Sequence, residues 1–168
     1  MRFKYCPQCG EKLIFKEIGD EGQIPFCEFC RRPFWDMFTT SIICAVINEY
    51  NEIALIRQSY ISKTKYVCIA GIMKPNEAAE ETAVREIKEE IGLDVEKLEY
   101  IRSYFYEKKS MLMLGFKAMV KKANFVLSGE VDSAEWVPLA NAPDKLREGG
   151  IAWALVRELL EKDNIKNW

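Results

Sequence analysis

Three glutamates crowd the end of one short, strongly charged segment of the chain. Residues 77–99 contain nine acids and three bases. On a helix with about 100° per residue, Glu86, Glu89 and Glu90 share one face, where like charges repel and the helix dipole is also negative. Such a conflict is typical of a functional site, because a divalent cation bound by these carboxylates would remove it. The alternative is a solvated acidic face.

The residue types around this segment limit the chemistry. Residues 101–122 contain six bases and one acid, and an acidic segment followed by a basic one suits a site that holds divalent cations with a phosphate ester. The chain contains no histidine, so any acid–base chemistry rests on carboxylates, thiols, lysines or tyrosines. The net charge of −2 argues against bulk electrostatic binding to nucleic acid or to an anionic membrane.

Four of the six cysteines form two short pairs near the N-terminus. Cys6 and Cys9 are separated by two residues, as are Cys27 and Cys30, and 17 residues lie between the pairs. This spacing is typical of a zinc ribbon, in which four cysteines bind the ion tetrahedrally. It favours structural Zn²⁺ over disulfides and over thiol–disulfide exchange, which is expected near a βαβ unit. Because so short a piece has little core, we expect zinc to supply folding free energy.

The elements that must position these residues suggest two domains. We predict a zinc ribbon over residues 1–38 and a second domain over residues 39–168. Strands are expected in the second domain at residues 41–47, 53–56, 66–70, 98–105, 111–120 and 135–139. A helix is expected over residues 77–91, with Asn76 as N-cap and Gly92 at its end, and another begins near Ile151. This order predicts an α/β fold, a mixed sheet with a helix on each side.

Length and composition agree with an ordinary globular protein. The chain has 168 residues, of which 49% are hydrophobic and 30% charged. No apolar run approaches the roughly 20 residues of a membrane helix. The first few residues are followed directly by the first cysteine pair, without an apolar targeting stretch. We therefore expect a cytoplasmic protein without membrane partners.

Residues 71–93 resemble the Nudix box. The box is G-x5-E-x7-R-E-U-x-E-E-x-G-U, where U is aliphatic, and Gly71, Glu77 and residues 85–93 match it at every fixed position. The resemblance implies a Nudix α/β/α sandwich. It also implies hydrolysis, with Mg²⁺ or Mn²⁺, of a nucleoside diphosphate linked to another moiety.

The resemblance implies roles for the box residues. Glu86, Glu89 and Glu90 correspond to the metal ligands, and Arg85, paired with Glu77, orients the loop and the helix. These five residues are the expected catalytic set. Hard oxygen ligands suit Mg²⁺, and bound cations neutralise pyrophosphate oxygens and position an attacking water.

Two further roles remain partly open. Glu130, which precedes Trp136, matches the place of an additional metal-binding glutamate in one branch of the family, and we expect it to be a fourth ligand. Without histidine, the base that activates water must be a carboxylate, either Glu89 or Glu130.

A four-cysteine ribbon before such a domain is similar to the NADH pyrophosphatase branch, which cleaves NAD(H) and can remove NAD caps from RNA. In that branch a Ser-Gln-Pro-Trp-Pro-Phe-Pro-x-Ser array follows the box. Residues 103–111 keep the first serine and an aromatic at the fourth place, but contain no proline. We expect NAD(H) or an NAD-capped RNA as substrate and a homodimer, with ADP-ribose, another nucleotide sugar or a nucleoside triphosphate as alternatives.

Substrate contacts are expected from the segment after the box and from the last helix. Tyr104, Phe105 and Tyr106 could stack on a base, although alternate aromatics in a strand are often core. Ala152 belongs to a loop that resembles the one beside the base in this branch. Lys108 and Lys109 are either a solvated turn or a phosphate clamp. A non-catalytic ligand sensor or RNA-binding module is the alternative from another functional class.

Overall fold

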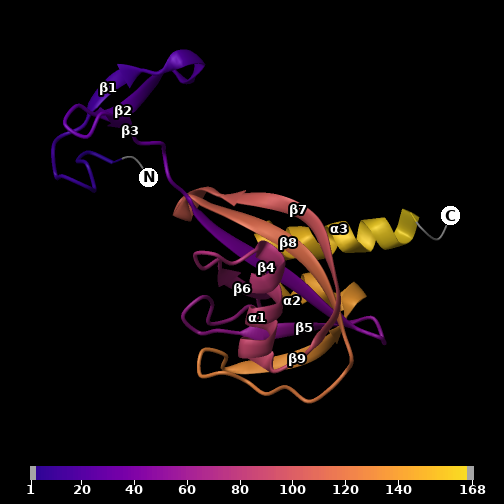
Figure 1. Ribbon diagram of the computed structural model, residues 1–168. Coiled ribbons are helices and arrows are strands. Elements are labelled where there is room, and N and C mark those ends of the chain that lie inside the picture. The colour runs from indigo at the N-terminus through magenta and orange to yellow at the C-terminus, as the bar shows by residue number, and fades with distance from the viewer. Residues whose placement is uncertain (1–2, 166–168) are drawn as a thin grey trace. The chain divides into compact units, whose positions relative to one another are not determined.

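The computed structural model describes residues 3–165, and the side chains of residues 3–162. The chain divides between Thr39 and Thr40 into two compact units, which are described separately (Figure 1). No helix in the described part of the chain has the length and apolarity needed to cross a membrane.

The first unit is a small three-stranded antiparallel sheet. Its strands are β1 (Ile14–Glu17), β2 (Gln23–Cys27) and β3 (Arg32–Pro33), in the order β1-β2-β3, with a 3₁₀ turn at Gly19–Glu21. Cys6, Leu13 and Cys27 form its small buried cluster. A cluster this small gives little hydrophobic stabilisation, so the unit needs another source of folding free energy.

The second unit is built on a mixed six-stranded sheet. Its strands are β4 (Thr39–Asn48), β5 (Glu52–Arg57), β6 (Ile69–Ile72), β7 (Val95–Tyr106), β8 (Met111–Val120) and β9 (Ser133–Pro138). Neighbouring strands follow the order β7-β8-β4-β5-β9, and β6 pairs with the first half of β4. The β4–β5 hairpin and the long β7–β8 hairpin are both antiparallel.

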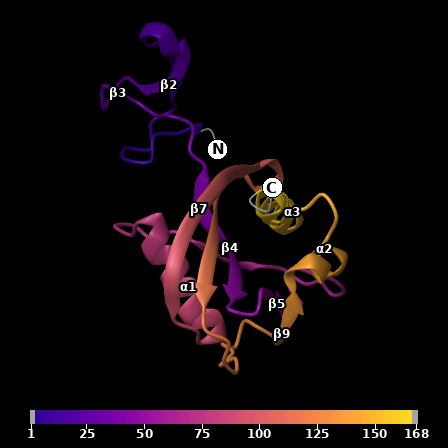
Figure 2. The same cartoon turned by 90° about the vertical axis from the view of Figure 1, so that its right-hand side faces the viewer.

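Helices cover both faces of this sheet (Figure 2). Successive side chains of β4 point to opposite faces, as the pleat requires. Ile42 packs in one core with Ile87 of α1 (Ala79–Ile91), and Ile43 packs in the other with Leu155 of α3 (Ile151–Ile165). The short α2 (Ala142–Lys145) borders the second core. The predicted α/β sandwich is therefore confirmed.

The ends of α1 differ in how well the sequence predicted them. Gly92 adopts the left-handed conformation at φ 75° and donates its N–H to the Lys88 carbonyl, as expected of a helix end. The N-cap is Ala78, so the prediction of Asn76 was wrong: Asn76 lies in a left-handed turn at φ 65°. Its neighbour Glu77 lies outside the helix, because its carboxylate bonds back to the Lys74 N–H.

The strand before the box also differs from its prediction. Residues 66–70 were expected to form it, with Gly71 as its end, but β6 begins at Ile69 and continues through Gly71 to Ile72. Of residues 66–68, Val67 makes only an isolated bridge to Ile56. Gly71 stays in the strand because its backbone pairs with Ile42. The predicted strand at 111–120 is confirmed, and the one at 98–105 is longer at both ends.

Candidate functional site

The box glutamates lie beside a cavity of about 990 Å³ in the second unit. Glu86 and Glu90 of α1 line it, as does Glu130, which lies between β8 and β9. Glu89 does not line it: its side chain is 53% exposed and accepts a hydrogen bond from Arg85. The structure thus brings three of the four predicted carboxylate ligands to one cavity.

Glu90 is the most constrained of these carboxylates. Its residue is 5% exposed, and Oε1 accepts a hydrogen bond of 3.0 Å from Nε2 of Gln58. Oε2 is buried without a hydrogen-bond partner. Burial, together with the negative charges of Glu86 and Glu130, raises the pKa of Glu90 to about 7. A buried oxygen without a donor, next to two more carboxylates, fits a divalent cation with oxygen ligands.

Arg85 organises the outer side of the same cluster. Its guanidinium donates to both oxygens of Glu77, at 2.6 and 2.9 Å, and to one oxygen each of Glu86 and Glu89, at 2.6 and 2.9 Å. The bond to Arg85 lowers the pKa of Glu77 to about 2, and the carboxylates raise that of Arg85. This bidentate pair ties the segment before α1 to the helix and sets the position of Glu86.

Gly71 leaves the space that the Glu86 side chain occupies. A Cβ on Gly71 would lie 2.0 Å from Cδ of Glu86. The backbone of Gly71 is held in place, because its carbonyl accepts a 2.7 Å hydrogen bond from Ser41 Oγ. The first residue of the box is therefore a glycine for a steric reason, since any larger side chain would displace a carboxylate of the cluster.

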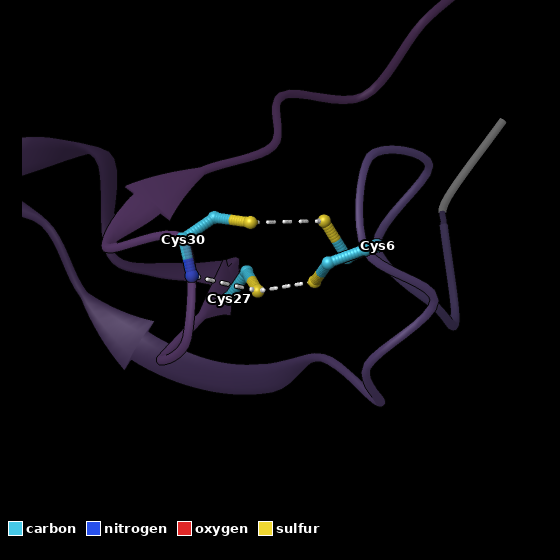
Figure 3. A group of neighbouring side chains, drawn as sticks. Cys6, Cys27 and Cys30 are labelled. Carbon is cyan, nitrogen blue, oxygen red and sulfur yellow. Dashed lines mark hydrogen bonds between the residues drawn. The ribbon is translucent and has the colours of Figure 1, made fainter.

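The four ribbon cysteines form a second candidate metal site (Figure 3). Their sulfurs all lie within 4.8 Å of one another. Sγ of Cys6 is 3.8 Å from that of Cys30, and Sγ of Cys9 is 3.5 Å from that of Cys27. A tetrahedron with Zn–S bonds of about 2.3 Å requires sulfurs about 3.8 Å apart. The donor set and its spacing fit a zinc ion.

A match to a family model decides which family the second unit represents. Residues 37–159, well over half of the chain, match the model described as NUDIX domain. The chain belongs to the Nudix family. The Nudix box predicted from the sequence is thereby placed in a domain of that family.

Two relatives of the chain are NAD-capped RNA hydrolases. The NAD-capped RNA hydrolase NudC of Pseudomonas aeruginosa is 28% identical over 154 residues, which is 91% of this chain and 54% of that protein. The NAD-capped RNA hydrolase NudC of Vibrio atlanticus is 28% identical over 94% of this chain and 58% of its own length. The chain therefore spans little more than half the length of these relatives.

Solved structures share the fold. The crystal structure of a NUDIX hydrolase from Nitrosomonas europaea has a TM-score of 0.70 and 22% identity, and it covers 96% of this chain and 93% of its own. The NUDIX domain of Shewanella oneidensis NrtR, solved in complex with ADP ribose, has a TM-score of 0.64 at 12% identity, with 76% of this chain and 90% of its own covered. These similarities support the Nudix fold assignment.

The predicted substrate residues of the Nudix unit separate into two groups. Tyr106 and Ala152 line the cavity. Tyr104 instead packs on Gly115 and the second core, and its hydroxyl is buried without a partner. Phe105 is 58% exposed and does not line the cavity. The alternation of a strand explains why Phe105 is separated from Tyr106, because neighbouring side chains of β7 point to opposite faces.

Several residues of the site were missed from the sequence: Gln58, which bonds to Glu90, and two tyrosines that line the cavity. Gln58 follows β5 and is a buried polar side chain, and a polar residue directly after an apolar strand is the signal that could have identified it. Tyr60 and Tyr66, from the loop between β5 and β6, line the cavity. Desolvation and the negative charge of Glu130 raise the pKa of the Tyr60 hydroxyl, which is therefore near the carboxylates. No local pattern distinguishes such loop tyrosines from ordinary surface residues.

Proposed function

We propose that this chain is a divalent-metal-dependent pyrophosphohydrolase that cleaves the diphosphate bridge of a dinucleotide, with NAD(H) or an NAD-capped RNA as substrate. The observation that carries the proposal is the buried, unpartnered Oε2 of Glu90, next to Glu86 and Glu130 in a cavity large enough for a nucleotide derivative. The relatives named NAD-capped RNA hydrolases support the choice of substrate.

In this proposal Glu86, Glu89, Glu90 and Glu130 hold Mg²⁺ or Mn²⁺. The cation supplies charge neutralisation at the phosphates and lowers the pKa of an attacking water. The chain's own residues prepare the site: Gln58 fixes Oε1 of Glu90 and leaves Oε2 without a donor, and Arg85 holds Glu86 and Glu89 in place. The base is Glu89 or Glu130, since the chain has no histidine.

The cavity offers aromatic surface for a base or nicotinamide ring. Tyr60 and Tyr106 both line it. The ring of Tyr66 is already flanked by Arg57 at 5.3 Å and Lys145 at 5.2 Å, so it forms a fixed wall. Stacking on one of the two other tyrosines would orient a dinucleotide so that its diphosphate reaches the carboxylates.

In the first unit, Cys6, Cys9, Cys27 and Cys30 bind a structural zinc ion in this proposal. A site closed by four cysteines leaves no open coordination position, so the ion has no part in hydrolysis. We also propose that the active form is a homodimer. Light scattering of the purified zinc-bound protein measures this directly.

A panel of substrates tests the proposed activity. Zinc-loaded protein is incubated with Mg²⁺ or Mn²⁺ and with NADH, ADP-ribose, a dinucleoside polyphosphate or an NAD-capped oligonucleotide, and the products are identified by mass spectrometry. We expect reduced NMN and AMP from NADH, and loss of product formation in Glu90→Gln. Folded, zinc-loaded protein that releases no mononucleotide from any of the four would refute the proposal.

The same panel separates the alternatives. Preferred cleavage of ADP-ribose would identify a nucleotide-sugar pyrophosphatase. Tight binding of a nucleotide without turnover would identify a ligand sensor. Both outcomes leave the Nudix assignment intact and change only the role of the cavity.

A further inference from the structure

Three lysines line the cavity without any partner for their charge. They are Lys74, Lys108 and Lys109. Within the described side chains, none of the three ammonium groups makes an ion pair or a hydrogen bond. Other lysines of the same unit are paired: Lys122 lies 2.6 Å from Glu52, and Lys88 lies 2.8 Å from Asp94. The cavity thus collects cations that the protein itself does not neutralise.

Lys108 and Lys109 occupy a defined turn. They belong to a 3₁₀ turn, Glu107–Lys109, at the tip of the β7–β8 hairpin, and Ser110 completes the turn in a left-handed conformation at φ 46°. The flanking residues Tyr106 and Met111 pair with each other across the hairpin and also line the cavity. The two lysines therefore stand at the tip of a paired hairpin, and this tip borders the cavity.

The opposite charges of the cavity come from other elements. Glu86, Glu90 and Glu130 lie on α1 and in the segment before β9, whereas the two lysines lie at the hairpin tip. A fourth cation, Arg147, also lines the cavity, but it is followed by Glu148, which lines it as well. The two hairpin lysines therefore lie on a different element from every carboxylate that lines the cavity.

A diphosphate bridge bound at the glutamates is not the only anion that the cavity could take. In the proposed function the bridge lies against the carboxylates of α1 and Glu130, whereas Lys108 and Lys109 stand on the hairpin tip. Lysine ammonium groups bind phosphate as compact point charges, and such charge-assisted bonds are strong. The hairpin tip therefore offers two ammonium groups to a further anion of the substrate.

We propose that Lys108 and Lys109, with Lys74, bind a phosphate group esterified to a ribose of the substrate, in addition to the two phosphates of the cleaved bridge. The inference rests on the proposed function and specifies its substrate class. The phosphate has two possible sources: a 2′- or 3′-phosphomonoester on a dinucleotide, or the 3′-phosphodiester that joins a capping dinucleotide to a nucleotide chain. Both present the same charged oxygens to the lysines.

Binding without catalysis gives the first test. Calorimetry without added divalent metal compares AMP with adenosine 2′,5′-bisphosphate and adenosine 3′,5′-bisphosphate, on zinc-loaded protein. We expect Lys108→Ala/Lys109→Ala to raise the Kd of at least one bisphosphate by about tenfold or more. The Kd of AMP should change less than about twofold. The matched control is Lys97→Ala/Lys121→Ala, which removes the same charge from the other end of the same hairpin. An equal loss of affinity for AMP and for both bisphosphates would overturn the proposal, and so would unchanged affinity for all three.

Turnover gives the second test and separates the two sources. The ratio of kcat/KM for NADPH to that for NADH, and for an NAD-capped oligonucleotide to NADH, is measured in the wild type and both double variants. In Lys108→Ala/Lys109→Ala, the NADPH-to-NADH ratio falls about tenfold if the lysines bind a phosphomonoester. The ratio for the NAD-capped oligonucleotide to NADH falls instead if they bind a phosphodiester.

The outcomes distinguish this proposal from the proposed function. Hydrolysis with both ratios unchanged in Lys108→Ala/Lys109→Ala overturns the phosphate subsite and keeps the hydrolase. Bisphosphate binding that depends on these lysines, in a protein that hydrolyses nothing, keeps the subsite and refutes the hydrolase.

Discussion

The two candidate metal sites of this chain are built in contrasting ways. The ribbon brings four sulfurs within 4.8 Å of one another. In the Nudix unit, by contrast, other side chains hold the glutamates: Gln58 holds Glu90, and Arg85 holds Glu86 and Glu89. Among the described side chains, the carboxylates do not form a cluster of that compactness.

Chemistry explains the difference. A thiol can donate as well as accept, so the sulfurs of Cys6 and Cys30, and of Cys9 and Cys27, can approach through hydrogen bonds. Ionised carboxylates only accept, so they repel unless a cation or a donor lies between them. Arg85 and Gln58 supply those donors. The cysteine site is thus formed by its ligands alone. The carboxylate site needs supporting residues to keep its ligands in place.

Removal of zinc should produce the largest effect. Structural zinc contributes about 10 kcal/mol or more to the folding of zinc-finger peptides. We expect a zinc-selective chelator to release one ion per chain, to expose the four ribbon thiols to a thiol reagent, and to remove amide protection from β1–β3. Cys44 and Cys68, which are 0% and 2% exposed, should stay unreactive as an internal control. Slow, uniform reaction of all six thiols would contradict a metal-dependent ribbon.

Glu90→Gln tests the carboxylate site. We expect kcat to fall on the order of 10³-fold, because the substitution removes a charged metal ligand. In the absence of divalent metal, the melting temperature should stay the same or rise, since a buried carboxylate with an unpartnered oxygen is replaced by a neutral group. Turnover and thermal unfolding measure the two effects. A strongly destabilised variant would indicate a structural role instead.

Gln58→Leu tests the supporting residue. It removes the donor to Oε1 of Glu90 at 3.0 Å. Loss of such outer contacts typically costs about 10–100-fold in metal affinity or activity. We therefore expect the Mn²⁺ concentration for half-maximal activity to rise by about tenfold, with little change in kcat at saturating metal. An unchanged metal requirement would show that Gln58 only fills space.

Gly71→Ala tests the steric fit around Glu86. The added methyl would lie 2.0 Å from Cδ of Glu86, so the carboxylate must move. We expect about a tenfold loss of activity with a stability loss of about 1–3 kcal/mol. Gly129→Ala, where a Cβ would meet nothing within 4 Å, controls for the general effect of an added methyl on stability. Equal stability of the two variants would show that Glu86 moves at no cost.

Glu77→Gln should give the smallest effect and a defined pH dependence. The Arg85 guanidinium lowers the pKa of Glu77 to about 2, against an ordinary value of about 4.3. The stabilisation from this pair is therefore present above about pH 4.3 and is lost as the pH falls toward about 2. Urea unfolding should show the variant less stable at neutral pH, with the difference shrinking as the pH falls through this window. Glu80→Gln, which alters an exposed acid in the first turn of α1, is the control.

The local parts of both sites were predictable from the sequence. Cysteine pairs and the box pattern are read over a few residues, because a knuckle or a helix places neighbours in a fixed geometry. The prediction of Asn76 as N-cap was wrong because the tertiary pair between Glu77 and Arg85 determines how the chain enters α1. The split between Tyr104 and Tyr106 likewise depends on what covers β7, which no local pattern records.

By itself, the sequence determined the α/β order of elements, the three box glutamates on one helix and the two cysteine pairs, since each follows from periodicity and short spacing. Only the tertiary structure decided that Gln58 supports Glu90, that Tyr104 packs into the core, and that the hairpin lysines border the same cavity as the carboxylates. Most of these contacts join segments far apart in the chain. The packing of the sheet and helices creates them, and residue spacing carries no record of that packing.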